Sequence, residues 1–279
     1  MTIILSDQKK SLSRKITAVR NSTIVFSIAL CNIVLLSCGS KKTVTTEDLI
    51  PAPSELKLAF EEVSLPKRHE RVTDIVFLKN SSSFLLAEQN GTVTHYQNNN
   101  GNIVDIISYS IPQTHQHRDC GLISITLDPE FATNQLLYAS LCFSDTESGV
   151  IRIHWNMNAN EWTISDAIVR VEDKNTIGPF HNVGVIRFDR TGNLWVPFGD
   201  KHVNKNAQNT VNAAGSVLRI QPNRDRPGYA DISDNPFVSS SNIIKGTYAY
   251  GFRSPWRIAI DHLDRVWVGD VGSNFEEVN

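Results

Sequence analysis

A repeated pair of short apolar strands is the feature that most constrains how this chain can fold. A turn rich in Asp, Asn or Gly joins the two strands of each pair. The pairs occupy residues 73–77 with 84–87, 122–127 with 136–140, 185–188 with 194–196, and 257–260 with 266–268. Third strands follow the first three pairs, at residues 92–96, 150–155 and 216–220. Short strands between turns, with weak helical periodicity, predict an all-β protein.

The four units align on one apolar position, which is an isoleucine in each: Ile75, Ile125, Ile186 and Ile258. A repeat of small sheets of this kind is typical of a β-propeller, so residues 57–279 are predicted to form about four blades. The spacing is irregular, which places insertions between the strands. A β-sandwich with similar hairpins remains the alternative.

The N-terminal segment has the pattern of a lipoprotein signal. A basic leader precedes an apolar run at residues 24–36, which is too short to span a bilayer comfortably. The run ends in Leu-Leu-Ser-Cys, which resembles the bacterial lipobox and predicts lipidation of Cys38. Residues 1–37 are then the signal peptide and 38–56 a flexible tether, so the protein is expected to be lipid-anchored in the cell envelope, periplasmic or associated with the outer membrane. An ordinary secretory signal or a membrane anchor helix is the alternative.

Charge and cysteine content narrow the function classes. The formal net charge is −2 and no basic cluster occurs in the folded region, so nucleic acid is not an expected partner. Two cysteines, Cys120 and Cys142, remain beyond the signal and lipid site, at the open end of the hairpin predicted for 122–141. They are predicted to form a disulfide, with two buried thiols as the alternative. The sequence has no CxxC spacing, so cysteine-bound metal is not expected.

A series of sequence blocks fills the last hundred residues. They are FHNVG at 180–184, GD at 199–200, AQ at 207–208, LRI at 218–220, DNPF at 234–237, GFRSPW at 251–256, GDVG at 269–272 and EEVN at 276–279. In this order and spacing they resemble the glucose/sorbosone dehydrogenase family, soluble sugar dehydrogenases that use pyrroloquinoline quinone (PQQ) and calcium. The resemblance implies oxidation of an aldose at C1 to the lactone, and an electron acceptor such as a cytochrome or a quinone.

The resemblance implies catalytic roles for two residues. His181 matches the histidine that takes the proton from the anomeric hydroxyl while hydride leaves C1 for the quinone. Some family members carry an acidic residue just before this histidine, where this chain has Phe180, so the imidazole is expected to find an orienting partner elsewhere. Arg253 matches the arginine beside the reactive carbonyl of PQQ, where a guanidinium stabilises developing oxyanion character. The alternatives are a turn histidine and a structural arginine.

Weaker assignments follow from the same blocks. Ser254, where the family usually has asparagine, and Gln208 are predicted to contact the cofactor, whereas Asp200 is expected to hold a turn. The backbone carbonyls of Gly272 and Ser273 are predicted to bind calcium. Asp119 is predicted to contact sugar hydroxyls, or to pair with a neighbouring arginine. His115 and His117 lie close by in the sequence, but two histidines without a third ligand do not predict a metal site.

The family closes six blades into a ring, so the chain is expected to be a fragment or truncated at its C-terminus. The family's later blades supply cations that hold the PQQ carboxylates, and this chain alone is therefore expected to bind PQQ weakly or not at all. A non-catalytic propeller of the hedgehog-interacting type, an inactive fragment and a calcium-dependent lactonase are the alternative functions.

Overall fold

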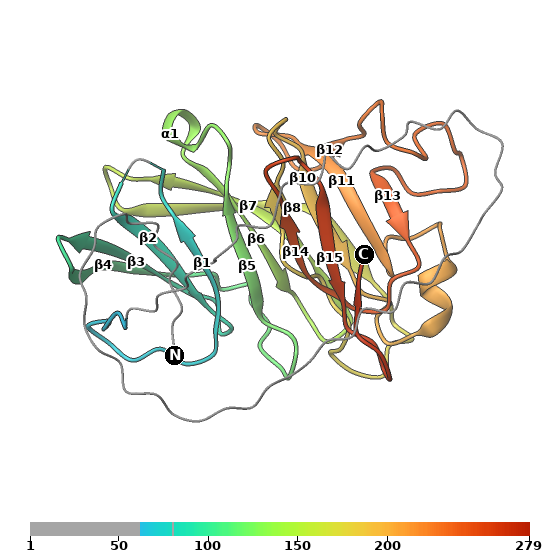
Figure 1. The fold of residues 1–279 in the computed structure, drawn as a ribbon, viewed down its shortest axis with the longest axis horizontal. Helices are drawn as coiled ribbons and strands as arrows, with labels where there is room; N and C mark the ends of the chain where they lie inside the picture. The colour runs from blue at the N-terminus through green and yellow to red at the C-terminus, as the bar shows by residue number, and fades with distance from the viewer. Residues whose placement is uncertain (1–61, 80) are drawn as a thin grey trace, which may run out of the picture. The chain divides into compact units, whose positions relative to one another are not determined.

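The computed structural model describes residues 62–79 and 81–279, and the chain divides into two compact units between Ser64 and Leu65. The predicted signal peptide at 1–37, Cys38 and the tether to residue 56 lie outside the described residues. The second unit holds four antiparallel sheets, each built from strands that are consecutive in the sequence (Figure 1). Within the described residues, no helix is long and apolar enough to cross a membrane.

The first two sheets have four strands each. Blade 1 contains β1 (Val72–Phe77), β2 (Ser83–Glu88), β3 (Thr92–Asn99) and β4 (Asn102–Ser110) in that order. Blade 2 contains β5 (Leu122–Leu127), β6 (Leu136–Cys142), β7 (Glu147–Asn156) and β8 (Glu161–Glu172), with the short α1 (Phe131–Asn134) between β5 and β6. The register of β6 against β7 runs without a break from Leu136 opposite His154 to Cys142 opposite Ser148.

The third and fourth sheets are less regular. Blade 3 contains β9 (Arg187–Phe188), β10 (Leu194–Phe198), β11 (Ser216–Pro222), β12 (Tyr229–Ala230) and β13 (Thr247–Tyr250), and the last two both pair with β11. A 3₁₀ helix, η2 (Asn204–Gln208), lies in the connection between β10 and β11. Blade 4 contains β14 (Pro255–Ile260), β15 (Val266–Asp270) and β16 (Glu277–Val278).

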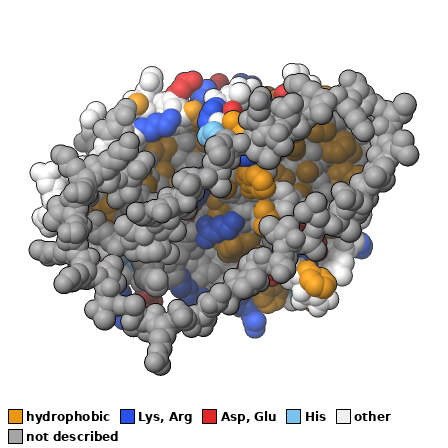
Figure 2. All heavy atoms as spheres, in the orientation of Figure 1, with side chains coloured by type: hydrophobic (Ala, Val, Ile, Leu, Met, Phe, Trp, Pro, Cys, Tyr) orange, Lys and Arg blue, Asp and Glu red, His pale blue; other side chains and the backbone are white. Residues whose placement is uncertain are grey.

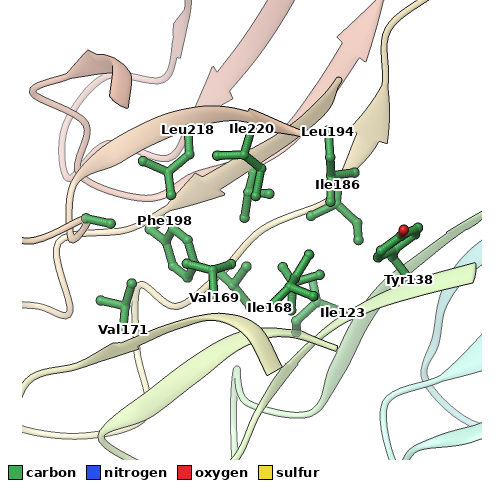
Figure 3. Packing of buried hydrophobic residues seen from close by; sticks show 14 of the residues in the cluster. Ile123, Tyr138, Ile168, Val169, Val171, Ile186, Leu194, Phe198, Leu218 and Ile220 are labelled. Atoms are coloured by element: carbon green, nitrogen blue, oxygen red, sulfur yellow. The ribbon is translucent and has the colours of Figure 1, made fainter. Parts of the chain in front are cut away.

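The hydrophobic core lies between neighbouring sheets. Figure 3 shows the layer between blades 2 and 3, where Ile123 and Tyr138 from blade 2 lie opposite Ile186 and Leu194 from blade 3. Similar layers join blades 1 and 2 and blades 3 and 4. Because both faces of an inner sheet are covered, β6 is buried along its whole length, which explains its continuous apolar sequence.

The first strands of the blades are tied to one another by a polar network, called the hub here, which is centred on the buried Asp74. Asp74 of β1 accepts two 3.0 Å hydrogen bonds from the guanidinium of Arg187 in β9. Ser124 of β5 donates to the same carboxylate at 2.6 Å. Arg257 of β14 donates to the carbonyl of Thr73 at 3.1 Å. Four sheets arranged around their first strands form a β-propeller, which confirms the predicted fold class and about four blades.

Blade 4 is the most open of the sheets. Several large apolar side chains on it and on its connections remain exposed, including Trp267 (45 %), Phe275 (81 %) and Val278 (75 %). On the face drawn in Figure 2, hydrophobic side chains (orange) reach the surface among separated Lys and Arg side chains (blue). The sandwich alternative requires two facing sheets, and the observed four sheets exclude it.

Candidate active site

His181 lies in the connection from blade 2 to blade 3 and is paired with a carboxylate. Its Nδ1 is 2.6 Å from Oδ1 of Asp200, and the two side chains are only 9 % and 3 % exposed. The backbone of His181 has φ 50°, a left-handed conformation that few non-glycine residues adopt. The structure therefore supplies the orienting acid that the sequence lacks at Phe180, and it comes from the residue that follows Gly199.

Gly199 makes this pairing possible because two chain segments meet there. A Cβ atom added at Gly199 would lie 2.5 Å from the carbonyl oxygen of His181, closer than any side chain allows. The amide of Gly199 donates to the carbonyl of Asn182 at 2.9 Å, and that of Lys201 to the carbonyl of His181 at 3.2 Å. The end of β10 thus delivers Asp200 to the imidazole.

The pairing sets the chemistry of the imidazole. A carboxylate can only accept, so Nδ1 of His181 carries a proton, and in the neutral imidazole the lone pair is then on Nε2. Within the described residues Nε2 makes no hydrogen bond. Asp200 also accepts a bond from the amide of His202 at 2.8 Å, so it holds the expected turn as well as the imidazole.

Lys201 is the functional candidate that the sequence did not reveal. Its side chain is fully buried, and Nζ donates to Ser148 Oγ and Asn182 Oδ1 at 2.7 Å each. Burial lowers the pKa of Lys201 to about 7, although the carboxylates of Glu147 and Asp173 oppose that shift. A lysine after Gly-Asp in a loop has the pattern of a solvated side chain, so nothing local in the sequence signals its burial.

Arg253 reaches the same place from the connection between β13 and β14. Its carbonyl accepts a 2.8 Å hydrogen bond from the amide of Asp200, so the backbones that carry the imidazole and the guanidinium are neighbours. The carboxylate of Asp270 accepts hydrogen bonds from the backbone amides of Arg253 and Ser254, at 3.0 and 2.6 Å. Asp270 therefore shapes the turn that carries Arg253.

The guanidinium of Arg253 uses only part of its hydrogen-bonding capacity. Nη1 donates to the carbonyls of Val271 at 2.6 Å and Gly272 at 3.4 Å. Nε and Nη2 make no bond within residues 62–79 and 81–279. An anionic or carbonyl-bearing ligand such as PQQ fits these open donors, whereas a hydroxyl group, which can donate, fits Nε2 of His181. The carbonyl of Gly272 accepts the long 3.4 Å bond from Arg253, and the calcium assignment for Gly272 and Ser273 stays a prediction.

The other residues predicted for the site differ in burial. Ser254 is buried, and its backbone joins Asp270 and Val271. Gln208, at the end of η2, is exposed, with its amide nitrogen 3.6 Å from where a Cβ of Gly251 would stand. Asp119 is exposed, in a loop whose Arg118 guanidinium lies 5.6 Å from the ring centre of Phe180.

The disulfide borders the site. Cys120 and Cys142 are bonded, with their Cα atoms 5.4 Å apart. The amide of Asn182 donates to the sulfur of Cys120 at 3.2 Å, and the carbonyl oxygen of the same side chain accepts from Lys201. The bonded cysteines therefore support the residue that follows His181.

Comparison with known proteins agrees with the fold and the sequence blocks. The model of the family described as Glucose / Sorbosone dehydrogenase matches residues 69–279. Aldose sugar dehydrogenase YliI of Escherichia coli K12 is 23 % identical over 203 residues, which cover 71 % of this chain and 53 % of that protein. The chain thus spans about half the length of this curated relative.

Two solved structures resemble the fold. One, a glucose dehydrogenase, is 23 % identical, with a TM-score of 0.64 over 75 % of this chain and 65 % of its own. The PQQ-bound aldose sugar dehydrogenase of Streptomyces coelicolor is 21 % identical, with a TM-score of 0.58 over 71 % of this chain and 56 % of its own. Since the family model covers most of the chain, this protein belongs to the glucose/sorbosone dehydrogenase family.

Proposed function

We propose that this chain carries the proton-accepting half of a PQQ-dependent aldose dehydrogenase site. The observation that carries the proposal is the buried His181–Asp200 pair, whose open Nε2 lies in a segment adjacent to that of Arg253. The match to a sugar dehydrogenase family supports the proposed substrate class, and the likeness to a PQQ-bound structure supports the proposed cofactor.

In the proposed reaction, Nε2 of His181 takes the proton of the anomeric hydroxyl as the C1–H bond breaks, leaving the lactone. PQQ, when bound, supplies a quinone that accepts the hydride from C1. Asp200 holds Nδ1 protonated and stabilises the imidazolium that forms. The open donors of Arg253 hold the cofactor and favour negative charge on its carbonyl oxygen, with Ser254 and Gln208 as further contacts and Asp119 on the sugar side.

The test is dye reduction by the full chain with aldoses, with PQQ in excess because weak binding is expected. His181→Ala should lower the rate about 10²–10⁴-fold, as for loss of a general base. The matched control is His262→Ala, which changes an exposed histidine on blade 4 and should leave the rate unchanged. A His181→Ala protein as active as the wild type, or a wild type without PQQ-dependent turnover, would contradict the proposal.

The envelope location and the lipid at Cys38 remain proposals, as does the cytochrome or quinone acceptor. The Cys120–Cys142 disulfide supports a compartment outside the cytosol, because such bonds persist where the environment is oxidising. Loss of membrane association in a Cys38→Ala protein, measured by fractionation, is the expected result.

A further inference from the structure

A cluster of two histidines and one aspartate lies outside the residues used so far. His115 Nε2 and His117 Nδ1 are 2.7 and 2.9 Å from the same oxygen, Oδ1 of Asp145. The three ligand atoms all lie within 4.8 Å of one another. The sequence alone shows only the two histidines, because the aspartate joins them from a turn almost thirty residues away.

The surrounding backbone holds the three residues in place before any ligand binds. The amide of His115 donates to the carbonyl of Cys142 at 2.9 Å, and His117 exchanges backbone hydrogen bonds with Cys120. Those two cysteines form the disulfide. Asp145 lies in the β6–β7 turn, where the hydroxyl of Ser144 accepts the amides of Thr146 and Glu147. Both segments are thus anchored to blade 2.

The chemistry of the cluster suits a borderline transition metal. Two imidazole nitrogens and a carboxylate oxygen are common ligands of Zn²⁺, which binds them at about 2.0–2.2 Å in tetrahedral geometry. Ligands in that geometry are roughly 3.4 Å apart, so Asp145 would have to move away from the imidazoles by about half an ångström. The side chains are 39 %, 49 % and 44 % exposed, which allows this adjustment and leaves a coordination position open to water.

We propose that His115, His117 and Asp145 bind one Zn²⁺ ion. In the metal-free protein His115 Nε2 and His117 Nδ1 face the accepting oxygen of Asp145 and carry protons. Metal binding displaces these protons, so that the two lone pairs coordinate and the ring protons lie on His115 Nδ1 and His117 Nε2. The ion joins the loop at residues 111–121 to the β6–β7 turn. That loop also carries Arg118, which faces Phe180, and Cys120, which touches Asn182. The ion therefore stiffens a wall of the candidate site, and its binding does not depend on the proposed sugar oxidation.

The experiment uses the full chain, stripped of metal by a chelator and titrated with Zn²⁺ by calorimetry and with Co²⁺ by visible absorption. One equivalent should bind, with the absorption of a tetrahedral site, and Zn²⁺ should raise the melting temperature. His115→Ala and His117→Ala should each weaken binding at least tenfold, and Asp145→Asn should weaken it less.

The matched control is His154→Ala, which removes an exposed histidine from β7 of the same blade and should bind as the wild type does. Melting of each variant in chelator, compared with the wild type in chelator, separates loss of ligand from loss of fold. The proposal is overturned if the wild type shows no saturable uptake of either metal. It is equally overturned if well-folded His115→Ala and His117→Ala proteins bind with unchanged affinity.

Discussion

Asp74 and Asp200 are two of the buried carboxylates that hold a basic side chain, and they do so in different ways. In the hub, the carboxylate of Asp74 accepts hydrogen bonds from both terminal nitrogens of the Arg187 guanidinium and from the hydroxyl of Ser124. It also accepts from the backbone amides of Ile75 and Ile125. At the candidate site, described contacts to the side chain of Asp200 come from the imidazole of His181 and the amide of His202, both on the same oxygen.

The backbone around the two carboxylates differs as well. The hub residues lie in strands, although the register shifts beside Asp74 and Ser124, whereas His181, Lys201 and His202 all have positive φ, between 50° and 59°. Left-handed backbone at such residues costs about 1 kcal/mol each and persists only where the surroundings impose it. The comparison teaches that the hub saturates its polar groups and joins blades. The candidate site keeps polar atoms without a partner among the described residues, together with strained backbone, which is typical of functional sites.

The largest expected effect is at the hub. Asp74→Ala leaves the Arg187 guanidinium without its carboxylate partner between three blades, and should lower the free energy of unfolding by about 3–5 kcal/mol. Denaturant unfolding measures this. Arg190→Ala is the control, since it breaks a surface ion pair with Asp264 at 3.5 Å and should cost less than about 1 kcal/mol. Equal losses in both variants would show that the hub is not a stabilising network.

A smaller effect is expected from Lys201, and it depends on pH. Its pKa is about 7 in the folded protein against 10.5 unperturbed, so between these values the unfolded chain binds more protons. Stability contributed by Lys201 therefore rises with pH across that window. The unfolding free energy of the wild type minus that of Lys201→Met should increase by about 3 kcal/mol from about pH 7 to about pH 10.

Lys174→Met is the matched control, because this lysine is 82 % exposed. The difference between the wild type and that variant should stay flat over the same range. A flat difference for Lys201→Met as well would mean that the lysine is charged and satisfied in the folded protein, and that the site resembles the hub more than it differs from it.

The smallest stability effect is expected at Asp200. In Asp200→Asn the amide oxygen can still accept from His181 and His202, so the loss should be about 1 kcal/mol. Dye reduction should nevertheless fall at least tenfold, because the imidazolium loses its counter-charge. Asp234→Asn, at an exposed position paired with Arg219, should change neither quantity. An Asp200→Asn protein as unstable as Asp74→Ala would remove the distinction between the two carboxylates.

The sequence predicted the inner strands of each blade, and β2, β6 and β10 among them are buried along their whole length. The paired strands at 122–127 and 136–140 lie within β5 and β6, and the isoleucines used for alignment lie in or beside the first strands. The outer strands β4, β8, β12, β13 and β16 were missed, because exposure interrupts their apolar pattern or because they are very short. A run of apolar residues along the sequence indicates a buried strand, and an outer strand lacks such a run because it is only partly buried.

The sequence by itself determined the repeated blades, the family blocks and the identity of His181 and Arg253 as the residues to examine, since each depends on local order along the chain. Only the tertiary structure decided that Asp200 orients the imidazole, that Lys201 is buried, and that Asp145 joins two histidines. These pairings arise where loops from different strands converge, and the distances across such loops depend on how neighbouring sheets pack, which no local stretch of sequence encodes.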